Sequence, residues 1–150
     1  MRVYNIFMIN THFTKLYKNK PRTLYQMMEQ ISKVNRKDCK FAFKLFEQIA
    51  LPFNKVDLHK YIQRYDNYHI KISEDTYILN DMSTHEVTKI IVGSSRIKVL
   101  TNQNNPVIFK LLQGYDDNLY VCDFDGDDYF WLNKINFKEE IKWFGIYYIF

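Results

Sequence analysis

Residues 119–133, which read Leu119-Tyr-Val-Cys-Asp-Phe-Asp-Gly-Asp-Asp-Tyr-Phe-Trp-Leu-Asn133, consist of two apolar runs around an acidic centre. Asp125-Gly126 in the middle is a strong signal for a type I′ hairpin turn, because both central residues of that turn take a positive φ. Centred there, the pattern pairs Cys122 with Tyr129 and Val121 with Phe130, and both faces of the ribbon are then largely apolar. The stretch therefore predicts a hairpin that is packed on both sides.

This register also places two acidic residues opposite each other, Asp123 on the first strand and Asp128 on the second. Like charges directly across a strand pair are destabilising. We therefore expect one of the two carboxylates to face solvent or to accept a hydrogen bond from a nearby backbone amide.

The acidic centre also allows a catalytic interpretation, that of a haloacid-dehalogenase-like phosphatase with Asp123 as nucleophile. Asp125 and Gly126 stand where that motif places its second acid and its turn. The chemistry further needs a lysine and acidic metal ligands, and only 24 residues follow Gly126. Asp127 also stands where the motif usually has Thr or Ser. The hairpin interpretation is favoured, and the phosphatase stays an alternative.

A calcium loop fails by position. If Asp123 is position 1 of such a loop, its glycine falls at Asp128 and its bidentate glutamate at Lys134. This interpretation is rejected.

Hydrophobic periodicity predicts helices in the first half of the chain and strands in the second. Asn10 or Thr11 can cap the first helix, and Asn105, Pro106 and Gly114 punctuate the last. We predict one α+β domain over residues 1–150, an α/β arrangement in which a mixed, mostly antiparallel sheet is flanked by about five helices. The expected helices are 12–19, 24–31, 37–50, 58–67 and 105–114, and the expected strands are 3–9, 68–72, 76–79, 87–92, 97–100, 119–124 and 129–132.

Composition narrows the class of function. The net charge is +4, from 21 basic and 17 acidic residues, and no block of five or more like charges occurs, which gives little support to a nucleic-acid-binding module. Cys39 and Cys122 have no C-x-x-C partner and fit ordinary burial in a reducing compartment. The four histidines lack metal-ligand spacing, so we expect no metal, no cofactor and no catalysis. With no signal peptide or membrane span expected, the location predicted is the cytoplasm.

Two aromatic stretches remain open at this level. Phe13 and Tyr17 are four residues apart, on one face of a short helix. They can pack onto the sheet, or, if Leu16 faces the core, they can project together as an interface anchor. The terminal stretch Ile141–Phe150, in a C-terminal extension over 136–150, is aromatic and too short to span a membrane, and an added edge strand or packing helix is favoured over an element on a membrane surface.

Three segments in order resemble the SirA family, the sporulation inhibitors of replication of spore-forming Firmicutes. The first is an aromatic-rich strand leading into Phe13-x-x-x-Tyr17. The second is Gln48-Ile-Ala-Leu-Pro52 before Leu58-His59. The third is residues 119–133, which are similar to the family's D-F-N-G-x-x-Y-x-W-L-N segment. The tail from Asn136 onward has no counterpart in the resemblance.

The resemblance implies a binding protein without enzymatic activity, whose partner is the N-terminal domain of the replication initiator DnaA. It implies that Phe13 and Tyr17 contact this partner, and that a second contact surface falls at Leu45, Gln48 and Lys134. Leu45 and Lys134 depart from the family's pattern, which has a proline at the position of Lys134. The implied assembly is a monomer that forms a heterodimer and affects DNA only indirectly.

Overall fold

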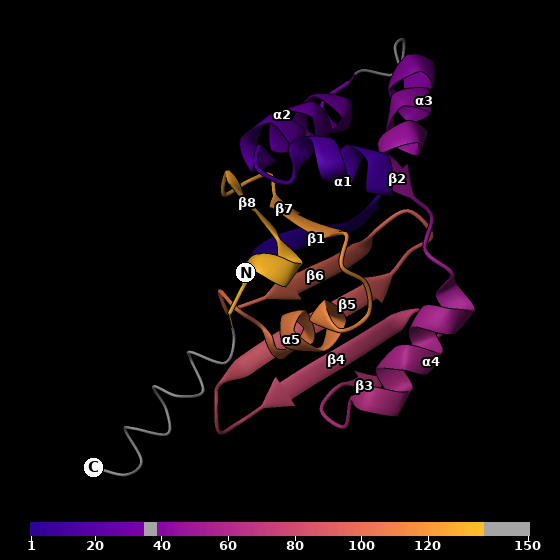
Figure 1. Cartoon of the computed structure of the whole chain (residues 1–150). Coiled ribbons are helices and arrows are strands. Elements are labelled where there is room, and N and C mark those ends of the chain that lie inside the picture. The colour runs from indigo at the N-terminus through magenta and orange to yellow at the C-terminus, as the bar shows by residue number, and fades with distance from the viewer. Residues whose placement is uncertain (35–38, 137–150) are drawn as a thin grey trace.

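The fold of the chain, seen in a computed structural model that describes residues 1–34 and 39–136, is one eight-stranded sheet with five helices (Figure 1). Every strand pairing is antiparallel, in the order β3-β4-β5-β6-β1-β7-β8, and β2 pairs with β1 beside this path. The predicted α+β class with about five helices is confirmed. The strands are β1 (Arg2–Ile9), β2 (Ala50–Leu51), β3 (Ile70–Lys71), β4 (Thr76–Asp81), β5 (Glu86–Val92), β6 (Ile97–Thr101), β7 (Leu119–Asp123) and β8 (Asp128–Trp131). The helices are α1 (Thr11–Tyr17), α2 (Pro21–Ser32), α3 (Cys39–Ile49), α4 (Lys55–Tyr65) and α5 (Val107–Gln113).

The sheet carries a hydrophobic core on each face, because side chains alternate between the faces along β1 and β7. Tyr4 and Ile6 of β1 belong to the core formed with α4 and α5. Phe7 and Ile9 belong to the other core, which α2 and α3 cover. Figure 1 shows α1, α2 and α3 gathered at one end of the molecule, over β1, β7 and β8. The first three helices therefore lie together over one end of the central strands, whereas α4 packs on the other face.

The hairpin of β7 and β8 has the predicted register but not the predicted turn. Cys122 pairs with Tyr129 and Asp123 with Asp128, as expected. The positive φ falls on Asp127, at 50°, and no glycine of the described residues has one. The connection is thus not a two-residue type I′ turn, since Phe124–Asp127 form a four-residue loop. The Gly126 amide donates to Oδ1 of Asp123 at 2.9 Å, and this bond selects the longer loop.

The Arg2 guanidinium offsets the repulsion between the Asp123 and Asp128 carboxylates, which face each other across the hairpin. Its Nη2 donates to Oδ2 of Asp123 at 3.0 Å and to Oδ2 of Asp128 at 2.9 Å. Asp123 is 3% exposed, so its charge lies inside the protein, whereas the side chain of Asp128 is 45% exposed. Both parts of the expectation are met, since Asp123 accepts a backbone amide and Asp128 faces solvent.

Several element boundaries differ from the sequence prediction. The short β2 was missed because two residues carry too little periodicity. The strand predicted at 68–72 is only two residues long, and residues 132–134 form a single 3-10 turn after β8. Pro106 occupies the N-cap position of α5 that was predicted for Asn105, and it makes no side-chain capping hydrogen bond. The predicted tail from residue 137 and the expected start of the third helix at residue 37 lie outside the described residues.

Helix α3 buries few of its residues, and the burial expected for Cys39 is wrong. Ala42 and Ile49 are buried, but Cys39 is exposed and Phe43 is 61% exposed. The helix faces the core along a narrow line, so residues on the flanks of that line lie in solvent. Cys122 is buried as predicted, and both cysteines are free.

Candidate partner-binding surface

Helix α1 is fixed to the core at its start by Asn10. The side-chain Oδ1 of Asn10 accepts the His12 amide at 2.9 Å and so caps the helix. The Asn10 amide donates to the carbonyl of Ile49 at 2.8 Å, at the end of α3. The two helices that carry four of the expected contact residues therefore meet at one point.

Phe13 and Tyr17 of α1 combine the two arrangements that the sequence left open, packing onto the core and exposure at the surface. The Phe13 and Tyr17 rings are stacked, with centroids 6.3 Å apart and planes 13° apart. Both are half-buried and pack against the core under α2 and α3. Leu16 is 54% exposed, so the idea that it faces the core is wrong. Successive helical residues are about 100° apart, which places Leu16 about 60° from Phe13 and about 100° from Tyr17, on the flank of the face that the two rings turn to the core. The exposed surface of α1 thus combines two ring edges with one leucine.

Two expected contact residues stand on α3, next to a hollow. Leu45 is half-buried against the same core as the aromatic pair, and Gln48, one turn later, is exposed. A hollow of about 360 Å³ lies at the end of α3, and its lining includes Phe43, Phe46 and Pro52. The structure therefore brings Phe13, Tyr17 and Leu45 onto one core, with Gln48 beside them on the surface.

Lys134 lies apart from these four residues. It ends the 3-10 turn after β8 and lines a hollow with Lys110 and Gln113 of α5. The turn is held by Gln113, whose Nε2 donates to the carbonyl of Leu132 at 3.0 Å. Asn133, next to Lys134 in the chain, lines this hollow and also lines a second hollow that lies beside α1. Lys134 thus lies outside the hollow beside α1 and next in the chain to one of the residues that line it.

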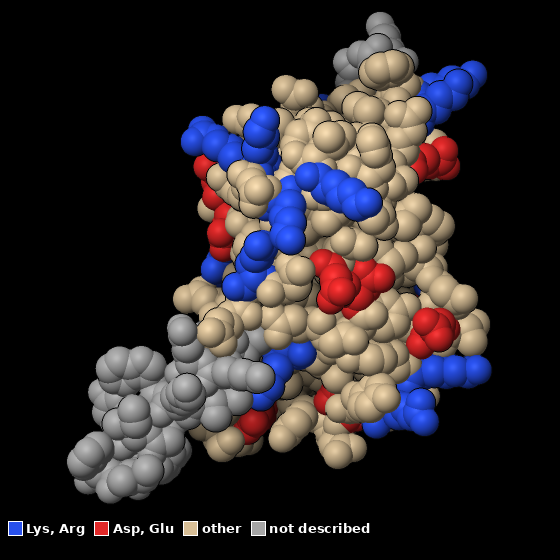
Figure 2. Space-filling model, in the orientation of Figure 1, with Lys and Arg blue, Asp and Glu red and all other residues tan. Residues whose placement is uncertain are grey.

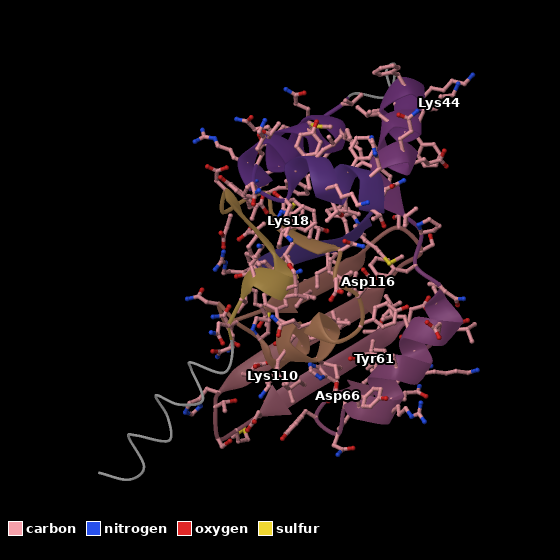
Figure 3. All side chains as sticks on the ribbon, in the orientation of Figure 1. Lys18, Lys44, Tyr61, Asp66, Lys110 and Asp116 are labelled. Atoms are coloured by element: carbon pink, nitrogen blue, oxygen red, sulfur yellow. The ribbon has the colours of Figure 1, made fainter. Side chains whose placement is uncertain are left out.

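Basic residues surround α1, a feature that the sequence reasoning missed. Lys15, Lys18, Lys20 and Arg22 fall within eight positions and are all exposed. Figure 2 shows basic side chains gathered over the α1 end of the molecule, beside a small acidic spot, and Figure 3 labels Lys18 and Asp116 on this face. Polar and apolar residues interrupt the four charges, so a search for unbroken blocks of charge passed over them.

Tyr120 and Cys122, two titratable residues of the core on which α1 packs, are neutral at physiological pH. Burial raises the pKa of the Tyr120 phenol, whose hydroxyl donates to the carbonyl of Pro21 at 2.6 Å. Burial also raises the pKa of the Cys122 thiol. The charge of this surface therefore comes from its exposed lysines and arginine and from the aspartates at its edge.

The carboxylate of Asp123 in the acidic hairpin is not free to act as a nucleophile. Oδ1 of Asp123 accepts the Gly126 amide, and Oδ2 accepts Nε and Nη2 of Arg2. A nucleophile needs a free oxygen that faces a substrate, and both oxygens of this buried carboxylate are engaged. Over residues 1–34 and 39–136, no group of three or more His, Cys, Asp or Glu side chains could hold a metal ion. In the same part of the chain, no helix has both the length and the apolar composition needed to cross a membrane.

Comparison with known families agrees with the resemblance of the three segments. The sequence model of the sporulation inhibitor of replication protein SirA matches residues 2–136, nearly the whole chain. The chain belongs to the SirA family. A search of curated proteins found no match. Membership in the SirA family places the chain among regulatory proteins that inhibit replication during sporulation.

Proposed function

We propose that this SirA-family protein inhibits chromosome replication by binding the N-terminal domain of the initiator DnaA, and so blocks the initiator's assembly at the origin. The observation that carries the proposal is the stacked, half-exposed pair of Phe13 and Tyr17 on α1, in a chain of a replication-inhibitor family. The mechanism is occlusion, in which α1 covers a surface that the initiator needs for other contacts. No reaction is involved.

The arrangement of α1 suits a protein interface. Aromatic side chains contribute most at interfaces when they are held in place before binding, because little conformational entropy is then lost. Phe13 and Tyr17 are held by the core beneath them, and Leu16 adds an exposed apolar side chain on the same helix. Gln48 and Leu45 extend the proposed contact along α3, and Lys134 marks its far edge. The contact surface proposed is therefore centred on α1.

Binding of the purified protein to the N-terminal domain of DnaA, measured by isothermal titration calorimetry, tests the proposal. Phe13→Ala and Tyr17→Ala should each weaken binding roughly 30-fold, since a hot-spot side chain contributes about 2 kcal/mol. Because both rings also support the core, Leu16→Glu serves as a second variant at an exposed position. It should weaken binding without lowering the melting temperature.

The matched control is Val56→Glu, which places the same charge at an exposed apolar residue of α4, a helix that packs on the other face of the sheet. It should bind like the unchanged protein. If the unchanged protein does not bind DnaA, the proposed partner is wrong. If it binds and Phe13→Ala, Tyr17→Ala and Leu16→Glu bind equally well, the partner stands and the proposed surface is wrong.

A further inference from the structure

A hollow of about 550 Å³ lies on the flank of α1, between this helix and the end of β8. The α1 residues that line it are Thr11, Thr14, Lys15 and Lys18, which are spaced so that they share one side of the helix. Asn118, Trp131 and Asn133 line the opposite wall, with Asp117. Phe13 and Tyr17 stand on another side of α1, so the hollow and the proposed contact surface share this short helix.

Two polar atoms of residues that line this hollow are buried without a partner. Trp131 is 3% exposed, and its indole Nε1 has no hydrogen-bond partner among the described residues. The Thr14 hydroxyl is likewise buried and unpaired within the described part of the chain. An unsatisfied buried donor costs about 1–3 kcal/mol, so its retention calls for an explanation such as a ligand. Both atoms can donate a hydrogen bond to an acceptor group.

The charges of the hollow specify the acceptor. Lys15 and Lys18 are exposed, and neither forms a salt bridge with any described residue. A carboxylate carries the charge opposite to the two ammonium groups and accepts hydrogen bonds through both oxygens, so it suits Lys15 and Lys18 and could also pair a buried donor at the edge of the hollow. We infer that this hollow binds a carboxylate side chain of the protein that docks on Phe13 and Tyr17. The inference rests on the proposed function, because it assigns an acidic docking face to the same partner.

A nucleic-acid backbone is a poorer match for the hollow. Asp117 is part of its lining, and its chain neighbour Asp116, labelled in Figure 3, is a second acid close by. A phosphate chain that tracked along the lysines of α1 would pass these two carboxylates. A single carboxylate can contact Lys15 and Lys18 and still avoid them. The mixed charge therefore favours an acidic protein residue.

Charge variants of α1 test the inference in calorimetric binding to the N-terminal domain of DnaA. Replacing Lys15 and Lys18 with glutamine should weaken binding about tenfold, and replacing both with glutamate should weaken it further. Affinity of the unchanged protein should also fall as salt rises, and that of the glutamine variant should fall less. The matched control changes Lys60 of α4 and Lys89 of β5 to glutamate, both exposed and away from α1, and should bind normally.

Trp131 provides a direct probe of occupancy. Trp143 is the second tryptophan of the chain, so a Trp143→Phe protein labelled with 5-fluorotryptophan gives a single fluorine resonance. Unlabelled DnaA domain should shift this resonance in the labelled protein, and the shift should be smaller in the Lys15→Gln, Lys18→Gln variant. Duplex DNA should leave the resonance in place, and a shift by DNA that the lysine changes remove would overturn the inference in favour of nucleic acid.

The outcomes separate the inference from the proposed function. If Phe13→Ala loses binding while both lysine variants bind like the control, the carboxylate site is wrong and the proposed function stands. If no variant and no unchanged protein binds the DnaA domain, the proposed function fails, and the carboxylate site fails with it. Melting curves of each variant exclude loss of folding as the cause.

Discussion

Removal of the Arg2 side chain should destabilise the protein by leaving two facing acids without a cation. Arg2→Met keeps most of the aliphatic length and removes the guanidinium. Beyond its bonds to Asp123 and Asp128, that guanidinium donates from Nη1 to Oδ1 of Asn104 at 2.8 Å, and it lies 4.6 Å from the centre of the Tyr4 ring. Four interactions therefore end with one substitution.

The magnitude follows from the distances. A charge pair at about 3 Å gains roughly 5 kcal/mol at an effective dielectric constant near 20. Ordering the arginine side chain and removing water from the groups offset about half of this. Because the Arg2 side chain is 33% exposed and that of Asp128 45%, solvent weakens the second pair more than the first. We expect Arg2→Met to lower the free energy of unfolding by about 2 kcal/mol.

Urea denaturation followed by circular dichroism measures this change. With a slope of about 2 kcal/mol per molar, the midpoint should fall by roughly 1 M. Lys89→Met, at an exposed strand position, is the control and should change the midpoint little. Adding Asp128→Asn to Arg2→Met should restore part of the loss, because it removes the charge opposite Asp123. If Arg2→Met matches its control, or if the double variant is no more stable than Arg2→Met, the account of the hairpin is refuted.

Two further predictions concern other parts of the molecule. Burial alone would raise the pKa of the Asp66 carboxyl, but hydrogen bonds from the His69 ring and from the Tyr68 and His69 amides lower it overall. A pKa lowered on folding adds stability that is complete above about pH 4 and is lost as the pH falls through the lowered value. Asp66→Asn should therefore reduce the free energy of unfolding at pH 7 by about 1–3 kcal/mol. The variant should also lose less of that free energy as the pH falls. If urea titrations show the same loss of stability in acid for the variant and the unchanged protein, this prediction is contradicted. Separately, a thiol reagent should modify exposed Cys39 quickly and buried Cys122 only after unfolding. Cys39→Ser should therefore abolish the fast phase of the modification. A fast phase that persists in this variant would show that Cys122 is accessible.

The sequence by itself determined the local elements and their order. The alternation of apolar residues fixed the register of β7 and β8, including the Asp123–Asp128 pair, since a slip of one residue would exchange the two faces. Asn10 and Gly114 marked helix ends because capping depends on neighbouring residues only. The same local patterns carried the resemblance to the SirA family over most of the chain.

Tertiary structure decided how these elements present their side chains. Whether Phe13 and Tyr17 or Leu16 face the core depends on where β7 and α2 lie, which periodicity in a seven-residue helix cannot reveal. Arg2 reaches Asp123 across 121 positions of the chain, and no local rule pairs residues so far apart. The hollow beside α1 joins Lys15 and Lys18 to Trp131 and Asn133 for the same reason. Spacing along the chain constrains near neighbours, and only the folded sheet brings distant residues together.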